Sequence, residues 1–243
     1  MRTAVTEPAG FPVRGIPLPP FAGALTTERL DAAAKRLLDI TVSLVLLVVL
    51  APVIVLLAVL VRLDSRGPAF FQVQRLGHGS RELLMLKFRK MHADATGIAL
   101  TTAGDARLTR IGAFLAKSKL DELPQLINVL HGQMSLVGPR PETLAFVECH
   151  RDEYEEIVSV RPGLVGLSQI AFVTEGSILD VEDPLTHYVS TILPQKVLLD
   201  LMYARQRTLL LDLRILGWSL VAVLLRRQVA VNRQTGRMNL RRR

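Results

Sequence analysis

The feature that most constrains this chain is an uncharged apolar segment, residues 40–61, with a proline near its middle. A bilayer core about 30 Å thick needs about 20 helical residues to cross, so the segment is long enough to span a membrane once. Basic residues flank it on both sides, namely Lys35, Arg36, Arg62 and Arg66. Because basic flanks favour the cytoplasm, both ends of the segment favour the same side of the membrane.

Pro52 adds a second argument against a straight span. Proline removes one backbone hydrogen bond and clashes with the preceding turn, so it kinks a helix. The sequence therefore predicts a re-entrant helix-break-helix over residues 35–62, broken at Ala51 and Pro52, which enters the membrane and returns to the cytoplasmic face. A single transmembrane helix is the alternative.

The rest of the chain divides around this segment by composition. Residues 1–34 begin with a Pro- and Gly-rich stretch without a secretory signal and are expected to form a flexible N-terminal arm. Residues 63–225 have the composition of a globular domain, expected to be cytoplasmic and catalytic. Residues 226–243 form a basic tail, which is either a contact for anionic lipid headgroups or a solvated disordered tail.

Charge and cysteine usage narrow the function classes. Lys and Arg exceed Asp and Glu by 30 to 22, which suits anionic lipid, phosphorylated substrates or nucleic acid. The long apolar segment and an aromatic content of 5% argue against a nucleic-acid binder. Cys149 is the only cysteine, so an intrachain disulfide and a CxxC metal site are excluded.

Local patterns in the middle of the chain predict a mainly helical α+β fold. Two short apolar runs, residues 68–75 and 82–88, flank a Gly-containing turn and predict a β-hairpin. Helical spacing or propensity marks residues 123–130, 144–158 and 194–211. Residues 209–225 predict either an amphipathic helix lying in the membrane interface or an ordinary core helix.

The candidate catalytic pair is Asp121 and Glu122, followed by Pro124. Proline is tolerated in the first turn of a helix, so a helix is expected to begin near Leu120 or Asp121. The helix macrodipole would then favour the ionised carboxylates by about 0.3–1 kcal/mol. An ionised Asp is a candidate nucleophile, and the pair could bind a divalent cation. The simpler alternative is a helix cap followed by a solvated first-turn Glu.

Basic residues beside rigid turns are candidate phosphate contacts. Arg binds phosphate through a fork of donors, and a proline-locked backbone fixes where that fork points. Arg140 stands between Pro139 and Pro141, which makes it the strongest of these candidates. The others are Lys87, Arg89, Arg107 and Arg161.

Several motifs, in order along the chain, resemble the bacterial sugar transferases, which are monotopic polyprenol-phosphate phosphoglycosyl transferases. The pair LDELPQL and MSLVGPRP, over residues 120–126 and 134–141, is the most specific. Further matching segments are KRLLDI, RGPAFFQVQRLG, KFRKM, the D-x-R-x-T of residues 105–109, and RPGLVGLSQI.

The resemblance implies a reaction and roles for its residues. A UDP-sugar would donate its sugar 1-phosphate to undecaprenyl phosphate and release UMP, as the first step of surface polysaccharide or glycoconjugate synthesis. Asp121 would be the nucleophile that carries a covalent phosphosugar, and Glu122 would hold Mg²⁺ or assist at phosphorus. Arg140 would lie in the active site, and Lys87, Arg89 and Arg161 would contact phosphate.

The resemblance also implies the setting and the partners of the enzyme. The chain would act at the cytoplasmic face of the bacterial inner membrane, with anionic lipids around it. Downstream glycosyltransferases and a second copy of the chain are further candidate partners. Longer relatives carry extra transmembrane helices and a further domain before the transferase unit, so this chain is expected to be a minimal version. A membrane-attached hydrolase and a non-catalytic scaffold are the rivals.

Two residues depart from the family pattern. Ala116 stands where relatives often carry Arg, with Lys117 beside it, and Lys119 stands where Ser is common. Both departures leave open which residues contact phosphate near the candidate catalytic pair. Residues 173–184 diverge as well, and they either shape the sugar pocket or form a surface loop.

Overall fold

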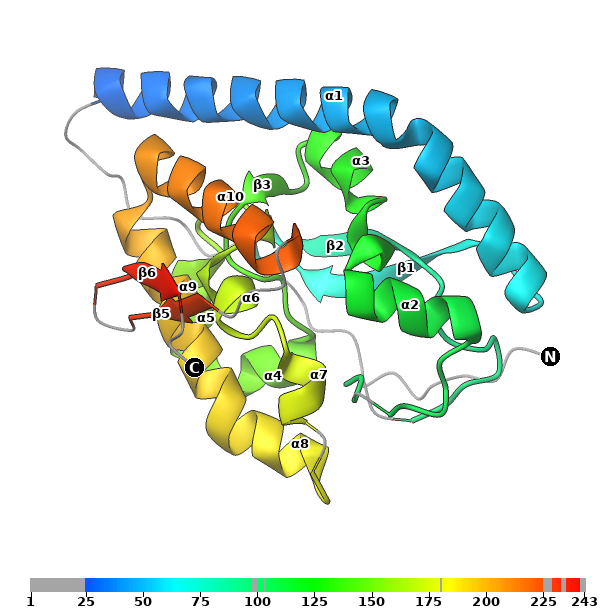
Figure 1. Cartoon of the computed structure of the whole chain (residues 1–243). Helices are drawn as coiled ribbons and strands as arrows, with labels where there is room; N and C mark the ends of the chain where they lie inside the picture. Colours follow the sequence, from blue (N-terminus) through cyan, green and yellow to red (C-terminus); the bar gives the residue numbers. More distant parts are fainter. Residues whose placement is uncertain are drawn as a thin grey trace.

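The computed structural model describes residues 25–97, 100–102, 104–179, 181–224, 229–232 and 235–240. Its fold is mainly helical α+β, as predicted from the sequence, with one long apolar helix at the N-terminal end (Figure 1). Residues 1–24 of the arm predicted over residues 1–34 and parts of the basic tail lie outside the described residues. The prediction of an arm is wrong for residues 25–34, which form the start of the long helix. Within the predicted tail, β5 (Val229–Val231) and β6 (Met238–Leu240) pair as a short antiparallel hairpin.

Helix α1 spans Leu25–Asp64 and contains Pro52. It begins ten residues before the segment predicted as the membrane element, and it continues through the predicted break as one bent helix (Figure 1). Its stretch Asp31–Asp64 is long and apolar enough to cross a membrane. Large apolar side chains along it are exposed, among them Leu44, Val48, Val49, Val55 and Leu56. An exposed apolar stripe of this size indicates membrane association.

The N-terminal half of α1 is bound to strand β3 (Ser135–Val137) by polar side chains one helical turn apart. Buried Asp39 accepts hydrogen bonds from the Ser135 hydroxyl at 3.1 Å and from the Leu136 N–H at 3.0 Å. Lys35 donates to the Val137 carbonyl at 3.1 Å and pairs with Asp212 at 2.6 Å. These contacts fix the main chain of β3 to α1.

The C-terminal end of α1 is bound to a different part of the same globular body. Asp64 accepts the N–H of Ile111 at 2.9 Å, at the start of α2 (Arg110–Ser118). Leu57 and Val61 pack with Phe88 and Leu115 in a small buried cluster. Both ends of α1 are therefore held by the domain that follows it.

Two strand pairs organise the middle of the chain. The predicted hairpin is confirmed: β1 (Phe70–Leu76) pairs antiparallel with β2 (Glu82–Phe88), from Phe70 opposite Phe88 to Leu76 opposite Glu82. Strand β3 pairs in parallel with β4 (Gly163–Val165). Between the two pairs, α3 (Gln125–Leu130) packs against α1.

The lower part of the domain in Figure 1 is built from short helices around α9 (Leu193–Gln206). The region predicted as one helix over residues 144–158 forms α4 (Leu144–Val147), a 3₁₀ turn, and α5 (Arg151–Ile157). The chain then passes through α6 (Leu167–Ala171), α7 (Glu175–Ile178), α8 (Pro184–His187) and a π-helical turn, Tyr188–Ile192, into α9. The predicted helix over 194–211 ends at Gln206, because Arg207 leaves helical geometry.

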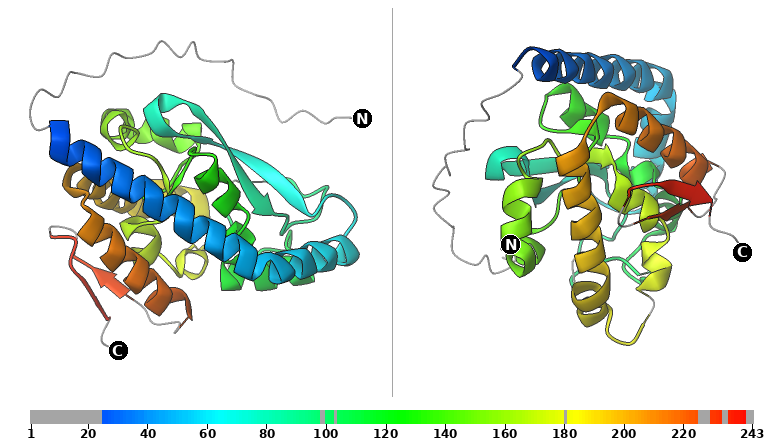
Figure 2. Two further views of the ribbon diagram at one scale, coloured as in Figure 1. Left: turned by 90° about the horizontal axis from the view of Figure 1, so that it is seen from above. Right: turned by 90° about the vertical axis from the view of Figure 1, so that its left-hand side faces the viewer.

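Helix α10 (Leu209–Leu224) lies on the same face as α1, and the view from above in Figure 2 places the two helices side by side. Its buried side carries Ile215, Ala222 and Asp212. Its opposite side exposes Leu210, Leu213 and Leu220. The helix therefore contributes to the core and also extends the exposed apolar surface of α1.

Candidate active site

The carboxylate pair lies on a tight turn between α2 and α3. Lys119 adopts a left-handed conformation with φ of 61°, which ends α2 and starts the 3₁₀ turn Leu120–Glu122. We expected a regular helix to begin near Leu120, but α3 begins at Gln125, after Pro124. The two carboxylates therefore lie on the 3₁₀ turn before α3 and not in the first turn of that helix.

Glu122 is held by two cations from different elements. Its Oε1 atom lies 2.8 Å from Lys87 Nζ, near the end of β2, and 3.5 Å from an Arg140 terminal nitrogen. Burial raises the pKa of Glu122, but Lys87 and Arg140 outweigh burial and hold this pKa well below its ordinary value. Glu122 is therefore ionised, and its charge is shared with both cations.

Asp121 is in a different electrostatic state. The residue is buried, and burial together with the neighbouring Glu122 raises the pKa of Asp121. Lys87, Lys90 and Lys119 act in the opposite direction, and Lys90 Nζ lies 3.8 Å from Asp121 Oδ2. Two adjacent carboxylates are thus driven apart in pKa, a pattern typical of catalytic pairs.

Arg140 reaches this pair from a turn whose backbone is closely packed. Gly138 N–H donates to Val165 O at 3.0 Å, and Gly163 N–H donates to Pro139 O at 2.8 Å. A Cβ on Gly163 would lie 2.0 Å from the Gly138 nitrogen, so this approach requires glycine. With Pro139 and Pro141 on either side of Arg140, the turn has little freedom to move.

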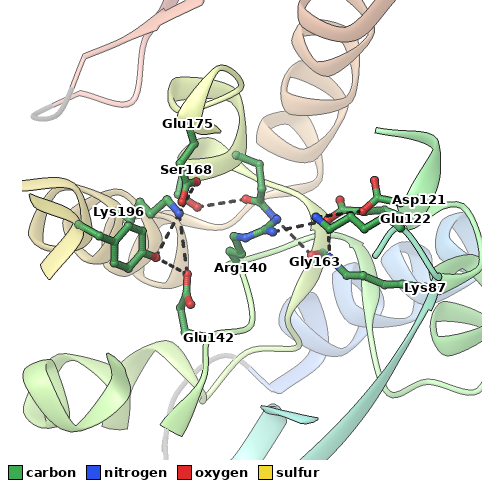
Figure 3. Close-up of polar contacts among 12 residues, drawn as sticks. Lys87, Asp121, Glu122, Arg140, Glu142, Gly163, Ser168, Glu175 and Lys196 are labelled. Carbon is green, nitrogen blue, oxygen red and sulfur yellow. Dashed lines mark hydrogen bonds and ion pairs between the residues drawn. The ribbon is translucent and has the colours of Figure 1, made fainter. Parts of the chain in front are cut away.

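Arg140 lies between two charged groups, as Figure 3 shows. On one side are Glu122 and Lys87, and on the other side is Glu142 with Lys196. The predicted site residues that the structure brings together are therefore Lys87, Asp121, Glu122 and Arg140, with the two prolines that flank Arg140.

The other predicted phosphate contacts have different partners. Arg89 donates to the carbonyls of Ser65, Arg66 and Pro68 at 2.7–2.8 Å and so closes the end of α1. Arg107 pairs with Asp105 at 2.6 Å and donates to Leu100 O. Arg161 donates to Gly132 O at 3.1 Å. A phosphate role for these three arginines stays a prediction.

Sequence reasoning missed two lysines of this region. Lys90, which faces Asp121, stands in the KFRKM segment from which only Lys87 and Arg89 were selected. Lys196 on α9 was not considered, although it is buried beside Glu142 and Glu175. A lysine within an apolar helix was the available signal for Lys196, because lysine is seldom fully buried without a partner.

Comparison with known proteins decides the family. The sequence model described as "Bacterial sugar transferase" matches residues 30–226. The chain belongs to the bacterial sugar transferase family. This bacterial sugar transferase matches long curated relatives over most of its own length but covers only part of theirs.

Three relatives illustrate the similarity. An undecaprenyl-phosphate glucose phosphotransferase of Komagataeibacter xylinus is 39% identical over 76% of this chain and 35% of the relative. A UDP-glucose:undecaprenyl-phosphate glucose-1-phosphate transferase of Xanthomonas campestris pv. campestris is 38% identical over 83% and 41%. A UDP-N-acetylgalactosamine-undecaprenyl-phosphate N-acetylgalactosaminephosphotransferase of Aeromonas hydrophila is 38% identical over 66% and 38%. The chain thus spans between 35% and 41% of these relatives.

The carboxylate pair of this family member also suits a magnesium ion. Mg²⁺ usually binds through one or two carboxylates, with water and substrate phosphates as its other ligands. Within the described residues, no group of three or more His, Cys, Asp or Glu side chains gathers into a site made by protein alone. Asp121 and Glu122 are the carboxylates that could hold such an ion together with the phosphates of a substrate.

Proposed function

We propose that this sugar transferase moves a sugar 1-phosphate from a UDP-sugar to undecaprenyl phosphate and releases UMP, as the first step of surface polysaccharide or glycoconjugate synthesis. One observation carries the proposal: in a member of this family, Asp121 and Glu122 lie together and are faced by Lys87, Lys90 and Arg140. Adjacent carboxylates surrounded by cations suit phosphoryl transfer, in which the attacking group and the phosphates are both anionic.

In the first step, an Asp121 carboxylate oxygen attacks the sugar-side phosphorus of the donor. A new bond forms between that oxygen and phosphorus, and the bond from phosphorus to the bridging oxygen breaks, so that UMP leaves with the electron pair. The side chain then carries a phosphosugar. Lys90 and Lys87 support this step because they oppose the burial that raises the pKa of Asp121.

In the second step, a phosphate oxygen of undecaprenyl phosphate attacks the same phosphorus. The bond between phosphorus and the Asp121 oxygen breaks, which regenerates the carboxylate and gives a sugar diphospholipid. The two substrates therefore react in turn at one carboxylate, which predicts ping-pong kinetics.

The cations have separate tasks in this scheme. Arg140 presents a forked donor to phosphate, and its closely packed turn fixes the direction of the fork. Lys87 is paired with Glu122 and holds that carboxylate ionised. Asp121 and Glu122 would hold Mg²⁺, which supplies positive charge against the transferring phosphoryl group when it is bound.

The fixed ends of α1 support a re-entrant membrane element. Lys35 and Asp39 bind β3, and Asp64 binds the start of α2, so both ends of the helix belong to one body. A helix with both ends on one globular domain enters and leaves the membrane from the same side. The exposed apolar side chains of α1 and α10 would then lie in the cytoplasmic leaflet of the inner membrane.

Mass spectrometry of the enzyme after incubation with donor alone tests the chemistry. UDP-glucose and UDP-N-acetylgalactosamine are suitable donors because relatives are named for both sugars. We expect an added sugar phosphate on the peptide that contains Asp121, and none in Asp121→Asn. Substantial transfer by Asp121→Asn would overturn the assignment of Asp121 as the nucleophile. UMP release that continues without undecaprenyl phosphate would point to hydrolysis.

Cysteine labelling tests the topology. Single cysteines placed before α1 and after Asp64, in a chain with Cys149→Ser, should both be closed to a membrane-impermeant reagent applied outside intact cells. If the cysteine before α1 is labelled from outside and the cysteine after Asp64 is not, α1 spans the membrane.

A further inference from the structure

A buried lysine with no part in the proposed chemistry lies behind the Arg140 turn. Lys196 on α9 is 2% exposed. Its Nζ atom lies 2.6 Å from Glu175 Oε2 and 3.9 Å from Glu142 Oε1. It also donates to the Tyr188 hydroxyl at 3.2 Å, and that hydroxyl donates to Glu142 at 2.9 Å. Two carboxylates thus share a single ammonium group.

The charge of this cluster acts on Arg140. Burial lowers the pKa of Arg140, but the carboxylates of Glu122, Glu142 and Glu175 outweigh burial and raise this pKa. The guanidinium therefore lies between the catalytic Glu122 on one side and two further carboxylates on the other (Figure 3). Without Lys196, the second side would carry two negative charges against the single charge of Glu122.

The main chain of Arg140 is held in place and should not move when the charge of Lys196 is removed, whereas its side chain is free to move. Asp200 accepts hydrogen bonds from the Ser168 hydroxyl, at 2.7 Å, and from the Arg140 backbone. The Glu142 carbonyl accepts the Leu76 N–H at 3.0 Å. The guanidinium is held less firmly, because its ion pair with Glu122 is 3.5 Å long.

We propose that Lys196 is a positioning residue for the transfer reaction: its single positive charge offsets one of the two negative charges of Glu142 and Glu175, so that the Arg140 guanidinium stays directed at Glu122 and the donor phosphates. The inference rests on the proposed function. Removing Lys196 alone leaves two buried carboxylates without their cation and should also lower stability, so its role in the reaction is tested by kcat and not by stability.

The test compares four variants by steady-state UMP release from UDP-sugars with undecaprenyl phosphate. Lys196→Met removes the charge and keeps the volume. It should lower kcat by about 10- to 100-fold, the scale reported for small misplacements of a catalytic group. Lys196→Arg keeps the charge and should retain most of the activity. Arg205→Met on the same helix, which removes an exposed pair with Glu156, is the matched control and should behave as wild type.

The double variant Lys196→Met/Glu175→Gln distinguishes positioning from simple structural support. Removing one of the two carboxylates restores the charge balance, so its kcat should exceed that of Lys196→Met by about tenfold, as expected for coupled neighbours. If Lys196 were merely structural, the thermal midpoint of Lys196→Met would fall, but its kcat measured well below that midpoint would stay at the wild-type value.

The outcomes separate the two levels of the proposal. Wild-type kcat in a well-folded Lys196→Met protein, or a double variant no better than the single one, overturns the role of Lys196. If wild type and Arg205→Met both fail to release UMP from any UDP-sugar supplied, the proposed function itself is wrong.

Discussion

Lys90 Nζ lies 3.8 Å from Oδ2 of Asp121, and this pair joins the end of the hairpin to the 3₁₀ turn that carries Asp121. The backbone of Lys90 is fixed by α2, because its carbonyl accepts the Thr109 N–H at 3.0 Å. A Cβ on Gly112 would lie 1.8 Å from the same carbonyl oxygen. Lys90 is thus placed by close backbone packing, as Arg140 is, and it faces the carboxylate whose pKa burial raises.

Removing this cation should change the pH dependence of the reaction. In the proposed mechanism Asp121 attacks when it is ionised, so the rate should fall as pH drops through the raised pKa of Asp121. Lys90 lowers the pKa of Asp121, and Lys90→Met should therefore move the acid limb of kcat to higher pH. The measurement is UMP release across a pH series. Lys90→Arg should keep the wild-type profile, as should Arg151→Met, which removes an exposed cation. An unmoved acid limb in Lys90→Met would contradict the pairing.

Gly163→Ala should damage the site by forcing apart two backbones. The added Cβ would lie 2.0 Å from the Gly138 nitrogen, so β4 must move away from the Arg140 turn. We expect a loss of stability of about 1–3 kcal/mol, typical of overpacking, and a larger relative loss of turnover. Gly217→Ala in α10 is the control: nothing lies within 4 Å of its added Cβ, and alanine should stabilise the helix by about 0.5–1 kcal/mol. Thermal unfolding and UMP release together check both variants. If Gly163→Ala were as stable as Gly217→Ala, the close approach of the Gly163 and Gly138 backbones would be contradicted.

The junction of α1, α9 and α10 predicts a ranking of stabilities. The Tyr203 hydroxyl lies 2.7 Å from Asp212 Oδ1 and 3.0 Å from Val137 O. Tyr203→Phe should cost about 1–2 kcal/mol, because Asp212 keeps Lys35 as a partner. Lys35→Met should cost about 3 kcal/mol or more, because it leaves a buried carboxylate without its cation. Thermal midpoints in one detergent give the order, and the reverse order would mean that Lys35 is not the main partner of Asp212.

Pro52→Ala tests what bends α1. Alanine restores the missing backbone hydrogen bond and favours a straight helix. A straight α1 cannot hold Lys35 at Asp212 and Asp64 at Ile111 at the same time, so one end should come free. We expect lower turnover, together with greater accessibility of a cysteine placed beside whichever end is released. Unchanged accessibility at both ends would show that contacts along α1, and not Pro52, set its shape.

Local sequence signals were sufficient where local geometry decides the outcome. The hairpin followed from two apolar runs around a glycine turn. The paired carboxylates ahead of Pro124 marked Asp121 and Glu122 as candidates, and the fold places them on a 3₁₀ turn. Arg140 was identified because proline stands on both sides of it. The start of α3 was wrong by several residues, because the left-handed geometry of Lys119 has no clear sequence signal in a non-glycine residue.

Pairings between distant segments could not be predicted. Arg89 resembles a phosphate contact in sequence, but the fold places the end of α1 around its guanidinium. Lys90 and Lys196 acquire their partners only when the end of β2 packs against the turn that carries Asp121 and α9 packs against the Arg140 turn. Side-chain chemistry is visible in a sequence, whereas the assignment of one cation to one carboxylate depends on tertiary packing.

With α1 in the bilayer as proposed, its attachment to β3 predicts that the thickness of the lipid bilayer affects catalysis. A bilayer that is thicker or thinner than the apolar length of a membrane helix forces that helix to tilt or bend. Here such a force would pass through Lys35 and Asp39 into the strand that leads directly to Arg140. Turnover should therefore be greatest in lipids whose acyl-chain length leaves α1 unstrained.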